Sequence, residues 1–306
     1  MHIVITGSSG LIGTKLVAAL EAAGHTVGRV TRSASGATPG EITWDPAAGV
    51  IDAEAFEGVD AVINLNGRSI GERRWTAAEK ELVYDSRIQT TRLLAQTLAG
   101  LDRKPSVFLS ASAVGYYGDR GDEVLTEDMS QGEGFFPKVC ADWEAETAPA
   151  ADAGIRVVTP RTGIVLDGGG GALGRLLAPF GPAWLSPYKW GLGGWIGSGR
   201  QWWSWVSMDD TIRAFVHLLT SDVSGPVNVV SPAPATNKQF MKAVGRALRR
   251  PVWLPIPKFA MRIFLGSGLA KSTLFDSTRA SSQKLEASGF VFEDSDLDAA
   301  LAEELG

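Results

Sequence analysis

The chain has 306 residues, of which 44% are hydrophobic, so it can bury a large core in one large domain or two small ones. Its net charge of −5 and pI near 5.4 argue against nucleic acid as a partner, because phosphate binding needs a concentrated basic surface. The chain has one cysteine, Cys140, and three histidines, which argues against a disulfide and a zinc site. It has no apolar run of roughly 20 residues, which argues against a membrane span. We therefore predict a cytoplasmic protein without metal.

Residues 1–13 predict a phosphate-binding turn between a strand and a helix. The apolar run at residues 3–5 indicates a buried strand, and the helix after the glycines would point free N–H groups and its positive dipole end at an anion. Gly7 allows the tight turn, Gly10 lets the backbone approach a pyrophosphate, and Gly13 lets the helix pack on the strand. A tight turn without a ligand is the alternative. The predicted cofactor contacts of this segment are Gly7, Ser8, Ser9, Gly10, Leu11, Ile12 and Gly13.

The end of the second predicted strand, residues 26–31, bears on the choice of cofactor. Sites that prefer NAD place Asp or Glu about 20 residues after the glycines, where the carboxylate binds the ribose 2′-hydroxyl. This chain has Thr31, Arg32 and Ser33 there, without a carboxylate nearby. Arg32 would attract a 2′-phosphate, which predicts NADP(H) rather than NAD(H). A solvated arginine at a strand end is the alternative.

Further strands and helices alternate along the chain. The pattern predicts strands at residues 41–44, 60–65, 106–110, 155–160 and 227–230, and long helices at residues 76–98 and 135–153. Thr76 and Glu79 have the spacing of a capping box at the first of these helices. The alternation predicts an α/β fold, a Rossmann-type doubly wound parallel sheet. The two long helices could form a homodimer face or part of the core.

We divide the chain into three regions. A Rossmann domain covers residues 1–166, and residues 207–231 return to its sheet. Residues 167–206, rich in Gly and Trp, form a lid or substrate loop, with an aromatic-packed structural loop as the alternative. Residues 232–306 form a small, mostly helical C-terminal substrate region.

Small and polar residues follow the predicted strands at the edge where doubly wound sheets bind their ligands. Leu65, Asn66 and Gly67 follow the fourth strand and are expected near the adenosine ribose and phosphates. After the fifth strand, Ser112 could hydrogen-bond a substrate oxygen, and two tyrosines could wall the site; an ordinary loop is the alternative. The remaining predicted cofactor contacts are Arg87, Ala111, Arg161, Thr162, Gly163 and Ile164.

Several of these motifs together resemble the extended short-chain dehydrogenase/reductases. The glycine motif, Arg32, Ser112 and residues 161–165 carry the general likeness. Residues 110–118, 126–128, 139–144, 197–201 and 204–210 resemble an atypical subfamily, usually labelled epimerase family protein or nucleoside-diphosphate-sugar epimerase. The tail from Pro251 is similar to that subfamily's small C-terminal domain, so the resemblance covers essentially the whole chain. It implies a small-molecule substrate that is a carbonyl compound or sugar-like.

The sequence departs from the wider superfamily at its acid/base motif. Typical members carry Tyr-x-x-x-Lys on the helix after the fifth strand, with Glu four residues later, and their lysine holds the nicotinamide ribose. Glu144 sets the register here, which places Phe136 at the tyrosine position and Cys140 at the lysine position. Phe136 cannot transfer a proton, and Lys138 lies about 200° around the helix from Cys140. The resemblance implies that this loss is usual within the subfamily.

Three functions stay open. A tyrosine that lacks the lysine is a poor base at neutral pH, since its ordinary pKa is about 10, but it can still donate a proton to an oxyanion formed by hydride delivery. The first hypothesis is therefore a carbonyl reductase with Ser112, Tyr116 and Tyr117 as catalytic residues. The second is a non-catalytic NADP(H)-binding redox sensor or partner-binding protein. The third is a nucleotide-sugar epimerase, which needs an efficient base. Residues 181–190 look like a local insertion relative to the subfamily.

Overall fold

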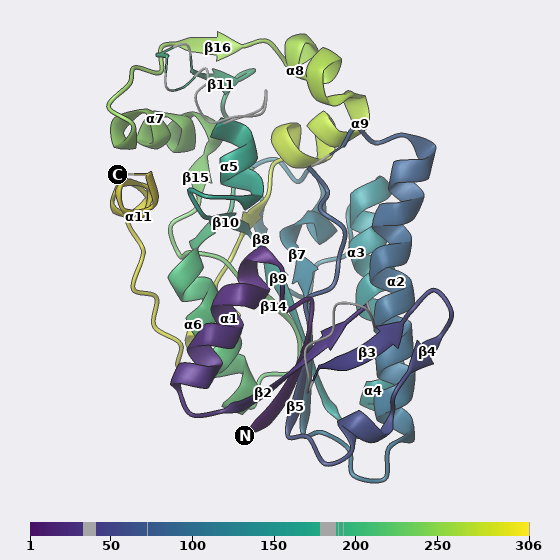
Figure 1. Cartoon of the computed structure of the whole chain (residues 1–306). Coiled ribbons are helices and arrows are strands. Elements are labelled where there is room, and N and C mark those ends of the chain that lie inside the picture. The colour runs from purple at the N-terminus through teal and green to yellow at the C-terminus, as the bar shows by residue number, and fades with distance from the viewer. Residues whose placement is uncertain (33–40, 72, 178–187, 189, 192, 306) are drawn as a thin grey trace.

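A central sheet of mostly parallel strands organises the molecule (Figure 1). The computed structural model describes residues 1–32, 41–71, 73–177, 188, 190–191 and 193–305. The strands run in the order β14-β9-β6-β5-β1-β2-β3-β4, and β7 also pairs with β9. Every pair in it is parallel except β3–β4, which is antiparallel. Its strands are β1 His2–Thr6, β2 Thr26–Thr31, β3 Ile42–Asp45, β4 Val50–Ile51, β5 Ala61–Asn64, β6 Val107–Ser110, β7 Ser112–Ala113, β9 Arg156–Thr162 and β14 Gly225–Val229.

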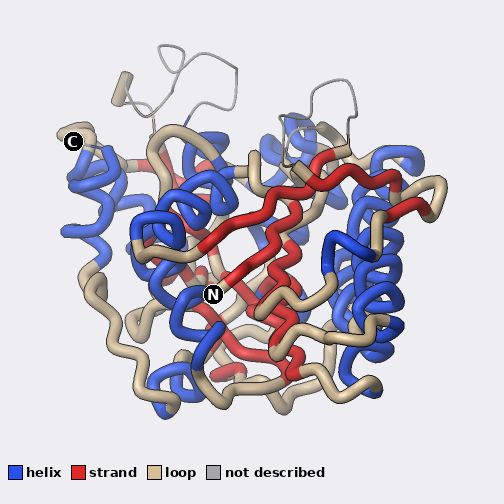
Figure 2. The backbone as a smooth tube through the Cα atoms, turned by 60° about the horizontal axis from the view of Figure 1, so that its bottom comes forward, coloured by secondary structure: helices blue, strands red, loops and turns tan. Residues whose placement is uncertain are grey.

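Helices cover both faces of the sheet (Figure 2). Alternate side chains of β1 point to opposite faces, so Ile3 and Ile5 pack with α1 (Leu11–Ala22) and α6 (Met208–Thr220), whereas Val4 packs with α2 (Ala77–Gly100). On the α2 side lie also α3 (Phe135–Ala145) and α4 (Ala148–Asp152). The predicted Rossmann-type doubly wound fold is confirmed.

A second core lies in the C-terminal half. Leu166, Trp203, Trp205, Phe240 and Leu301 are buried together there. The strands outside the main sheet are β8 Val124–Leu125, β10 Ile164–Leu166, β11 Gly194–Ile196, β12 Trp202–Trp203, β13 Trp205–Ser207, β15 Ala235–Thr236, β16 Leu254–Ile256 and β17 Arg279–Ala280. The remaining helical segments are η1 Glu54–Phe56, η2 Val114–Tyr117, α5 Gly171–Leu177, α7 Asn237–Ala247, α8 Lys258–Leu265, α9 Ser267–Ala270, η4 Lys271–Phe275, α10 Gln283–Ala287 and α11 Leu297–Leu305. The domain boundaries at residues 166, 206 and 231 stay predictions.

Two local predictions are wrong. The expected helix at residues 135–153 is two helices, because Pro149 lies in the first turn of α4 and could not donate a hydrogen bond inside one continuous helix. The capping box at α2 is half formed. The hydroxyl of Thr76 accepts from the Glu79 N–H, but the Glu79 carboxylate binds Arg68 at 2.6 Å instead of turning back to the cap.

The tryptophans of residues 168–205 have different surroundings. Trp203 and Trp205 are buried in the second core, which supports the aromatic-packed reading for these two positions. Trp190 is exposed, whereas Trp184 and most of the insertion at residues 181–190 lie outside the described residues. No helix in the described part of the chain is both long and apolar enough to span a membrane.

Candidate functional site

The turn between β1 and α1 has no room for side chains at two of its glycines. Gly7 has φ +72°, and a Cβ there would lie 2.8 Å from the backbone carbonyl of Leu65. A Cβ on Gly13 would lie 2.2 Å from the Gly7 carbonyl oxygen. The Gly10 N–H closes the turn by donating to Gly7 O at 3.0 Å. The turn therefore has the tight geometry and close helix packing that the sequence predicts.

The N-terminus of α1 is arranged to receive an anion. The α1 helix has no side-chain cap and no acidic residue in its first turn, and Ser9, Gly10 and Leu11 are exposed. The first N–H groups of a helix have no partner within the helix, so a phosphate could accept from them here. Ser8 and Ile12 are half-buried beside them. This cradle fits the pyrophosphate of a dinucleotide.

The other predicted cofactor contacts near the glycine turn follow the two strands that flank β1, which are β2 and β5. Leu65 follows β5 and touches Gly7, and Asn66 and Gly67 continue the same edge. Arg32 follows β2 on the opposite side of β1 and is exposed. The sheet order thus places Arg32 on the β2 side of the glycine turn and the Leu65–Gly67 segment on the β5 side.

A buried polar cluster ties three strand ends together. The amide of Asn64 accepts from the Thr6 hydroxyl at 2.9 Å, and donates to Ser110 at 3.1 Å and to Thr91 at 2.8 Å. Trp143 of α3 donates to the same Thr91 hydroxyl at 2.8 Å. Our sequence reasoning did not single out this cluster. A pattern in the sequence could have pointed to it, because Thr6, Asn64 and Ser110 are polar residues that each end an apolar run.

Ser112 is held by a buried ion pair. Its hydroxyl donates to the carboxylate of Glu144 at 2.6 Å, and Arg161 donates to both oxygens of that carboxylate at 2.8 Å. The Arg161 and Glu144 side chains are only 3% and 14% exposed. Burial lowers the pKa of Arg161, but the hydrogen bonds and charge of Glu144 outweigh it, so the pKa lies above its ordinary value. Arg161, a predicted cofactor contact, is therefore engaged within the protein.

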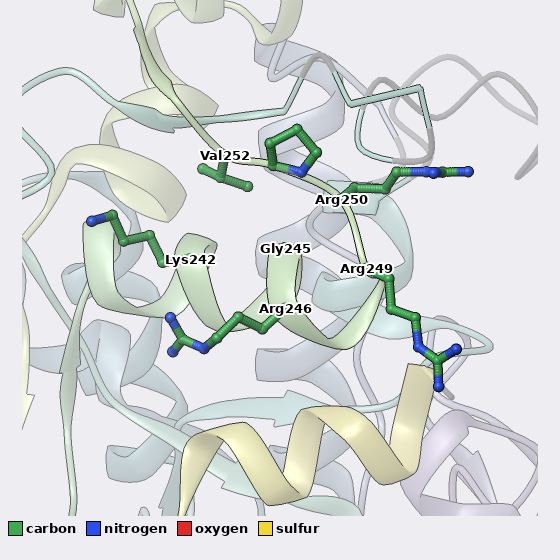
Figure 3. Close-up of a pocket in the computed structure, with 7 residues that line it drawn as sticks. Lys242, Gly245, Arg246, Arg249, Arg250 and Val252 are labelled. Atoms are coloured by element: carbon green, nitrogen blue, oxygen red, sulfur yellow. The ribbon is translucent and has the colours of Figure 1, made fainter.

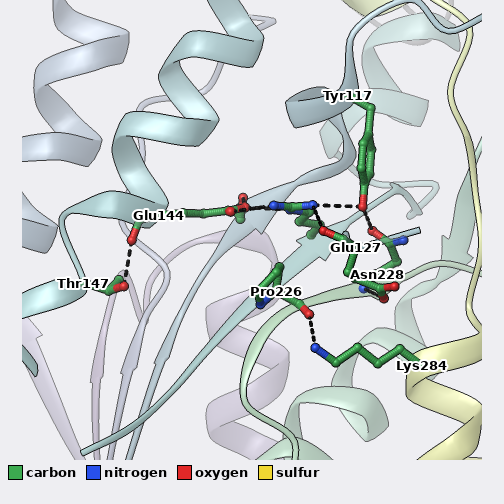
Figure 4. A network of polar contacts seen from close by, with 9 residues as sticks. Tyr117, Glu127, Glu144, Thr147, Pro226, Asn228 and Lys284 are labelled. Atoms are coloured by element: carbon green, nitrogen blue, oxygen red, sulfur yellow. Dashed lines mark hydrogen bonds and ion pairs between the residues drawn. The ribbon is translucent and has the colours of Figure 1, made fainter. Parts of the chain in front are cut away.

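The two tyrosines after Ser112 have unlike environments. The Tyr117 hydroxyl is fully buried, accepts from Arg161 at 3.0 Å and donates to Asn228 at 2.8 Å (Figure 4). Burial raises the pKa of Tyr117. Tyr116 is half-buried, its ring lies 3.5 Å from the Arg161 guanidinium, and its hydroxyl bonds to none of the described residues. Of these two tyrosines, only Tyr116 thus has a hydroxyl that bonds to no described residue. The sequence analysis did not identify Asn228 as a site residue.

One face of α3 carries the altered acid/base positions. Phe136 packs against Gly115, where a Cβ would lie 2.3 Å from its ring. One turn on, Cys140 is fully buried beside the Ala113 N–H, and burial raises the pKa of its thiol to about 12. A further turn on, Glu144 binds Ser112. Lys138 points elsewhere and pairs with Asp142 at 2.5 Å.

The remaining predicted contacts line the same edge. The Ala111 N–H donates to Asn64 O at 2.9 Å, and Thr162 pairs with Ala113 in the sheet. Gly163 is packed so closely that a Cβ would lie 2.6 Å from Ser204 O. Ile164 donates its N–H to the same carbonyl at 2.8 Å. Arg87 is buried on α2 beside Gly67.

A shallow basic concavity lies elsewhere, on α7 and the segment after it (Figure 3). It encloses about 350 Å³. Its lining is Lys242, Gly245, Arg246, Arg249, Arg250, Pro251 and Val252. None of these is a predicted site residue. The predicted site residues gather at the strand edge, and we take that edge as the candidate site. Among the residues that the structure describes, no group of His, Cys, Asp and Glu could hold a metal ion.

The fold and this edge define a dinucleotide-binding α/β protein of the short-chain dehydrogenase/reductase type. Residues 3–230 match the model of the NAD dependent epimerase/dehydratase family, and residues 256–304 match a domain of unknown function, DUF1731. The chain belongs to the NAD dependent epimerase/dehydratase family. The resemblance seen in the sequence is confirmed.

Named relatives span nearly the whole chain. Epimerase family protein Mb2239 of Mycobacterium bovis is 44% identical over 98% of this chain and 96% of its own length. The crystal structure of human epimerase family protein SDR39U1 (isoform 2) with NADPH is 33% identical, with a TM-score of 0.87, and covers 100% of this chain and 99% of that one. The crystal structure of the nucleoside-diphosphate sugar epimerase from Corynebacterium glutamicum is 34% identical, with a TM-score of 0.80, over 100% of this chain and 58% of that one.

Proposed function

We propose that this chain binds NADP(H) at the β1–α1 turn and reduces a small carbonyl substrate beside Ser112. The observation that carries the binding is the turn itself, where Gly7 and Gly13 admit no Cβ and the first N–H groups of α1 have no side-chain cap. The human relative crystallised with NADPH supports the same ligand. Arg32, exposed at the end of β2, supplies the charge that favours a 2′-phosphate over a 2′-hydroxyl.

The chain's own groups then have separate roles. When bound, NADPH supplies a hydride. Tyr116, whose phenol is unengaged, donates the proton to the substrate oxygen. Ser112, fixed by Glu144, orients that oxygen. Tyr117 keeps the site's shape rather than touching substrate, because its hydroxyl is already shared between Arg161 and Asn228.

The first experiment is an anaerobic titration of the protein with NADPH and with NADH. Ten tryptophans provide the signal, through quenching and energy transfer to the nicotinamide. We expect tight binding of NADPH and weak binding of NADH. Gly10→Val should abolish both, and Arg32→Ala should remove the preference, whereas Gly100→Ala, where an added Cβ meets nothing within 4 Å, should bind like the wild type. Absence of binding by the wild type would end the proposal.

The reduction step needs its own test. The wild type would be incubated with a panel of carbonyl compounds and NADPH carrying deuterium at the transferred position. We expect deuterium at the carbinol carbon of one product, and at least tenfold slower turnover in Tyr116→Phe with unchanged NADPH affinity. If NADPH stays reduced with every carbonyl compound, the proposed reduction is refuted, whereas the proposed binding of NADP(H) still stands.

Two observations favour other functions. Ser112 is already bound to Glu144, as would suit a sensor that only binds NADP(H); a partner protein captured only in the NADPH-loaded state would support it. The Corynebacterium glutamicum structure carries the name nucleoside-diphosphate sugar epimerase. Conversion of a nucleotide-sugar with catalytic NADP⁺ would favour that activity over carbonyl reduction.

A further inference from the structure

The segment between Asp222 and Asp276 is basic, although the chain as a whole is acidic. It contains eight of the 29 lysines and arginines and none of the 34 aspartates and glutamates. The segment includes α7, β16 and α8, and Figure 1 shows β16 and α8 at the end of the molecule opposite the N-terminus. Basic charge is thus gathered in one part of a protein whose net charge is −5, so this part attracts anions that the rest of the surface repels.

Large apolar side chains are exposed on β16 and α8. Trp253 and Leu254, at the start of β16, are each 74% exposed. Phe259 and Ile263 are 64% and 71% exposed, and their spacing of four residues puts them on one face of α8. Neighbouring elements thus present four large apolar side chains to water. Such clusters are typical of surfaces that bind a partner or a membrane.

The helix α8 has three distinct faces. Met261 and Leu265 pack against the second core, on the side away from the exposed apolar face. Lys258 and Arg262 are exposed on a third face, between the other two. Both cations lie over the ring of Phe275, at 5.1 and 5.7 Å from its centroid, which holds them beside the apolar face. An exposed apolar face flanked by Lys and Arg is typical of helices that lie in a membrane interface.

The basic concavity adjoins this helix and strand (Figure 3). Its lining extends to Val252, the residue before the exposed tryptophan, and includes the exposed Lys242 and Arg249. Arg246 in the same lining pairs with Asp298 at 2.7 Å. A space of about 350 Å³ beside Lys242 and Arg249 can receive a phosphate group. The concavity thus adds anion-binding groups next to the exposed apolar side chains.

We propose that these elements form a surface that docks on an anionic lipid bilayer. The docking surface consists of Lys242, Arg249, Trp253, Leu254, Lys258, Phe259, Arg262 and Ile263. Its apolar side chains enter the headgroup layer, and its cations contact lipid phosphates. The protein docks on the bilayer without crossing it.

A bilayer fits this surface better than a folded protein or a nucleic acid does. Side chains that are so exposed protrude from the molecule, and a fluid bilayer accepts protruding groups without a matching shape. Leu254 and Ile263 are aliphatic, and they offer a nucleic acid neither charge nor an aromatic ring for stacking. The inference goes beyond the proposed function and does not depend on it, because no residue of the docking surface is a predicted site residue.

The test is co-sedimentation of the full chain with lipid vesicles. Vesicles of phosphatidylcholine alone are compared with vesicles that also contain phosphatidylglycerol. We expect binding only to the anionic vesicles, and weaker binding as the salt concentration rises. Phe259→Ser combined with Ile263→Ser should weaken binding by at least about tenfold, because two large apolar side chains no longer leave water. Val291→Ser, the matched control at a residue that is 70% exposed, should bind like the wild type.

A second set of variants tests the charges and the tryptophan. Arg249→Gln combined with Arg262→Gln should weaken binding by about tenfold, as expected for two basic residues near an anionic surface. Arg103→Gln, at a side chain that is 75% exposed in another part of the molecule, is the control and should have no effect. Trp253→Phe should still bind, but it should lose most of the blue shift in tryptophan emission that accompanies binding of the wild type. NADPH affinity should be unchanged in every variant.

Four outcomes would overturn the inference. The first is a wild type that ignores anionic vesicles or binds neutral ones equally well. The second is vesicle binding that none of the docking-surface variants weakens. The third is a dimer, seen by light scattering, that the Phe259→Ser, Ile263→Ser variant loses while no form of the protein binds vesicles, which would assign the surface to a second copy of the chain. The fourth is binding to polyglutamate without binding to vesicles, which would assign it to an acidic protein.

Discussion

At the β1–α1 turn the backbone itself forms the site, whereas side chains from five elements form the region around Ser112. The turn depends on Gly7 and Gly13, whose neighbours leave no space for a Cβ. The region around Ser112 depends on hydrogen bonds that join β7, η2, α3, β9 and β14. The first region is built mainly from residues 7–13, which include no charged side chain. The second joins residues that are far apart in the sequence and contains the buried ion pair of Arg161 and Glu144.

The largest effect is expected from a methyl group at the turn. In Gly13→Ala the new Cβ would lie 2.2 Å from the Gly7 carbonyl oxygen, a contact with backbone that no rotamer relieves. We expect loss of NADPH binding and a fall of more than about 3 kcal/mol in the free energy of unfolding. Titration and urea denaturation would measure both. A Gly13→Ala protein that binds NADPH normally would show that the turn is not backbone-limited.

The Ser112 region should respond to charge in a way that the turn does not. Arg161→Met leaves Glu144 without its cation, which should lower the free energy of unfolding by about 3 kcal/mol. Adding Glu144→Leu should recover part of this loss, because both charges are then absent. The exposed pair Arg92–Glu146 is the control, and Arg92→Met should change stability by less than about 1 kcal/mol. Equal losses at the buried and the exposed pair would contradict the comparison.

The adjacent tyrosines should separate stability from turnover. Tyr117→Phe leaves Asn228 and Arg161 short of a partner, so the free energy of unfolding should fall by about 1–2 kcal/mol. Tyr116→Phe removes a hydroxyl that bonds to no described residue, so stability should change by less than about 0.5 kcal/mol while carbonyl reduction slows. Denaturation curves and initial rates distinguish the two. The reverse pattern would move the proton donor to Tyr117.

The smallest effect concerns the lysine position. Burial raises the pKa of the Cys140 thiol from 9.0 to about 12, so hardly any thiolate exists at pH 8. The folded protein should resist iodoacetamide at pH 8, and the protein unfolded in guanidinium should be alkylated. Because the folded state holds this proton more tightly, the thiol's contribution makes stability fall as the pH rises from 9 to about 12. Rapid alkylation of the folded protein at pH 8 would contradict this burial.

Sequence reasoning recovered the parts of the site that are local in the chain. The turn at Gly7–Gly13 follows from residue types and spacing, and the parallel sheet with helices on both faces follows from alternating elements. The role of Arg161 did not, because Arg161 lies on strand β9 and its partner Glu144 on helix α3, and nothing in the sequence reports their bidentate contact. Pro149 marks the break between α3 and α4, but our sequence reasoning placed one helix across residues 135–153. The burial of Tyr117 against Asn228 joins residues 111 positions apart, beyond the reach of any periodicity.

The pairing of β17 with β8 has a consequence for biosynthesis. These strands join the end of the chain to the segment just after Tyr117, and the hydrogen bond from Ser277 to Asp119 spans 158 residues. Asn228, which fixes Tyr117, also donates to the Ser281 carbonyl at 3.1 Å. Contacts of such sequence separation form late in folding. On the ribosome, the glycine turn can fold once the first strands emerge, but the wall around Tyr117 must wait until nearly the whole polypeptide has been translated.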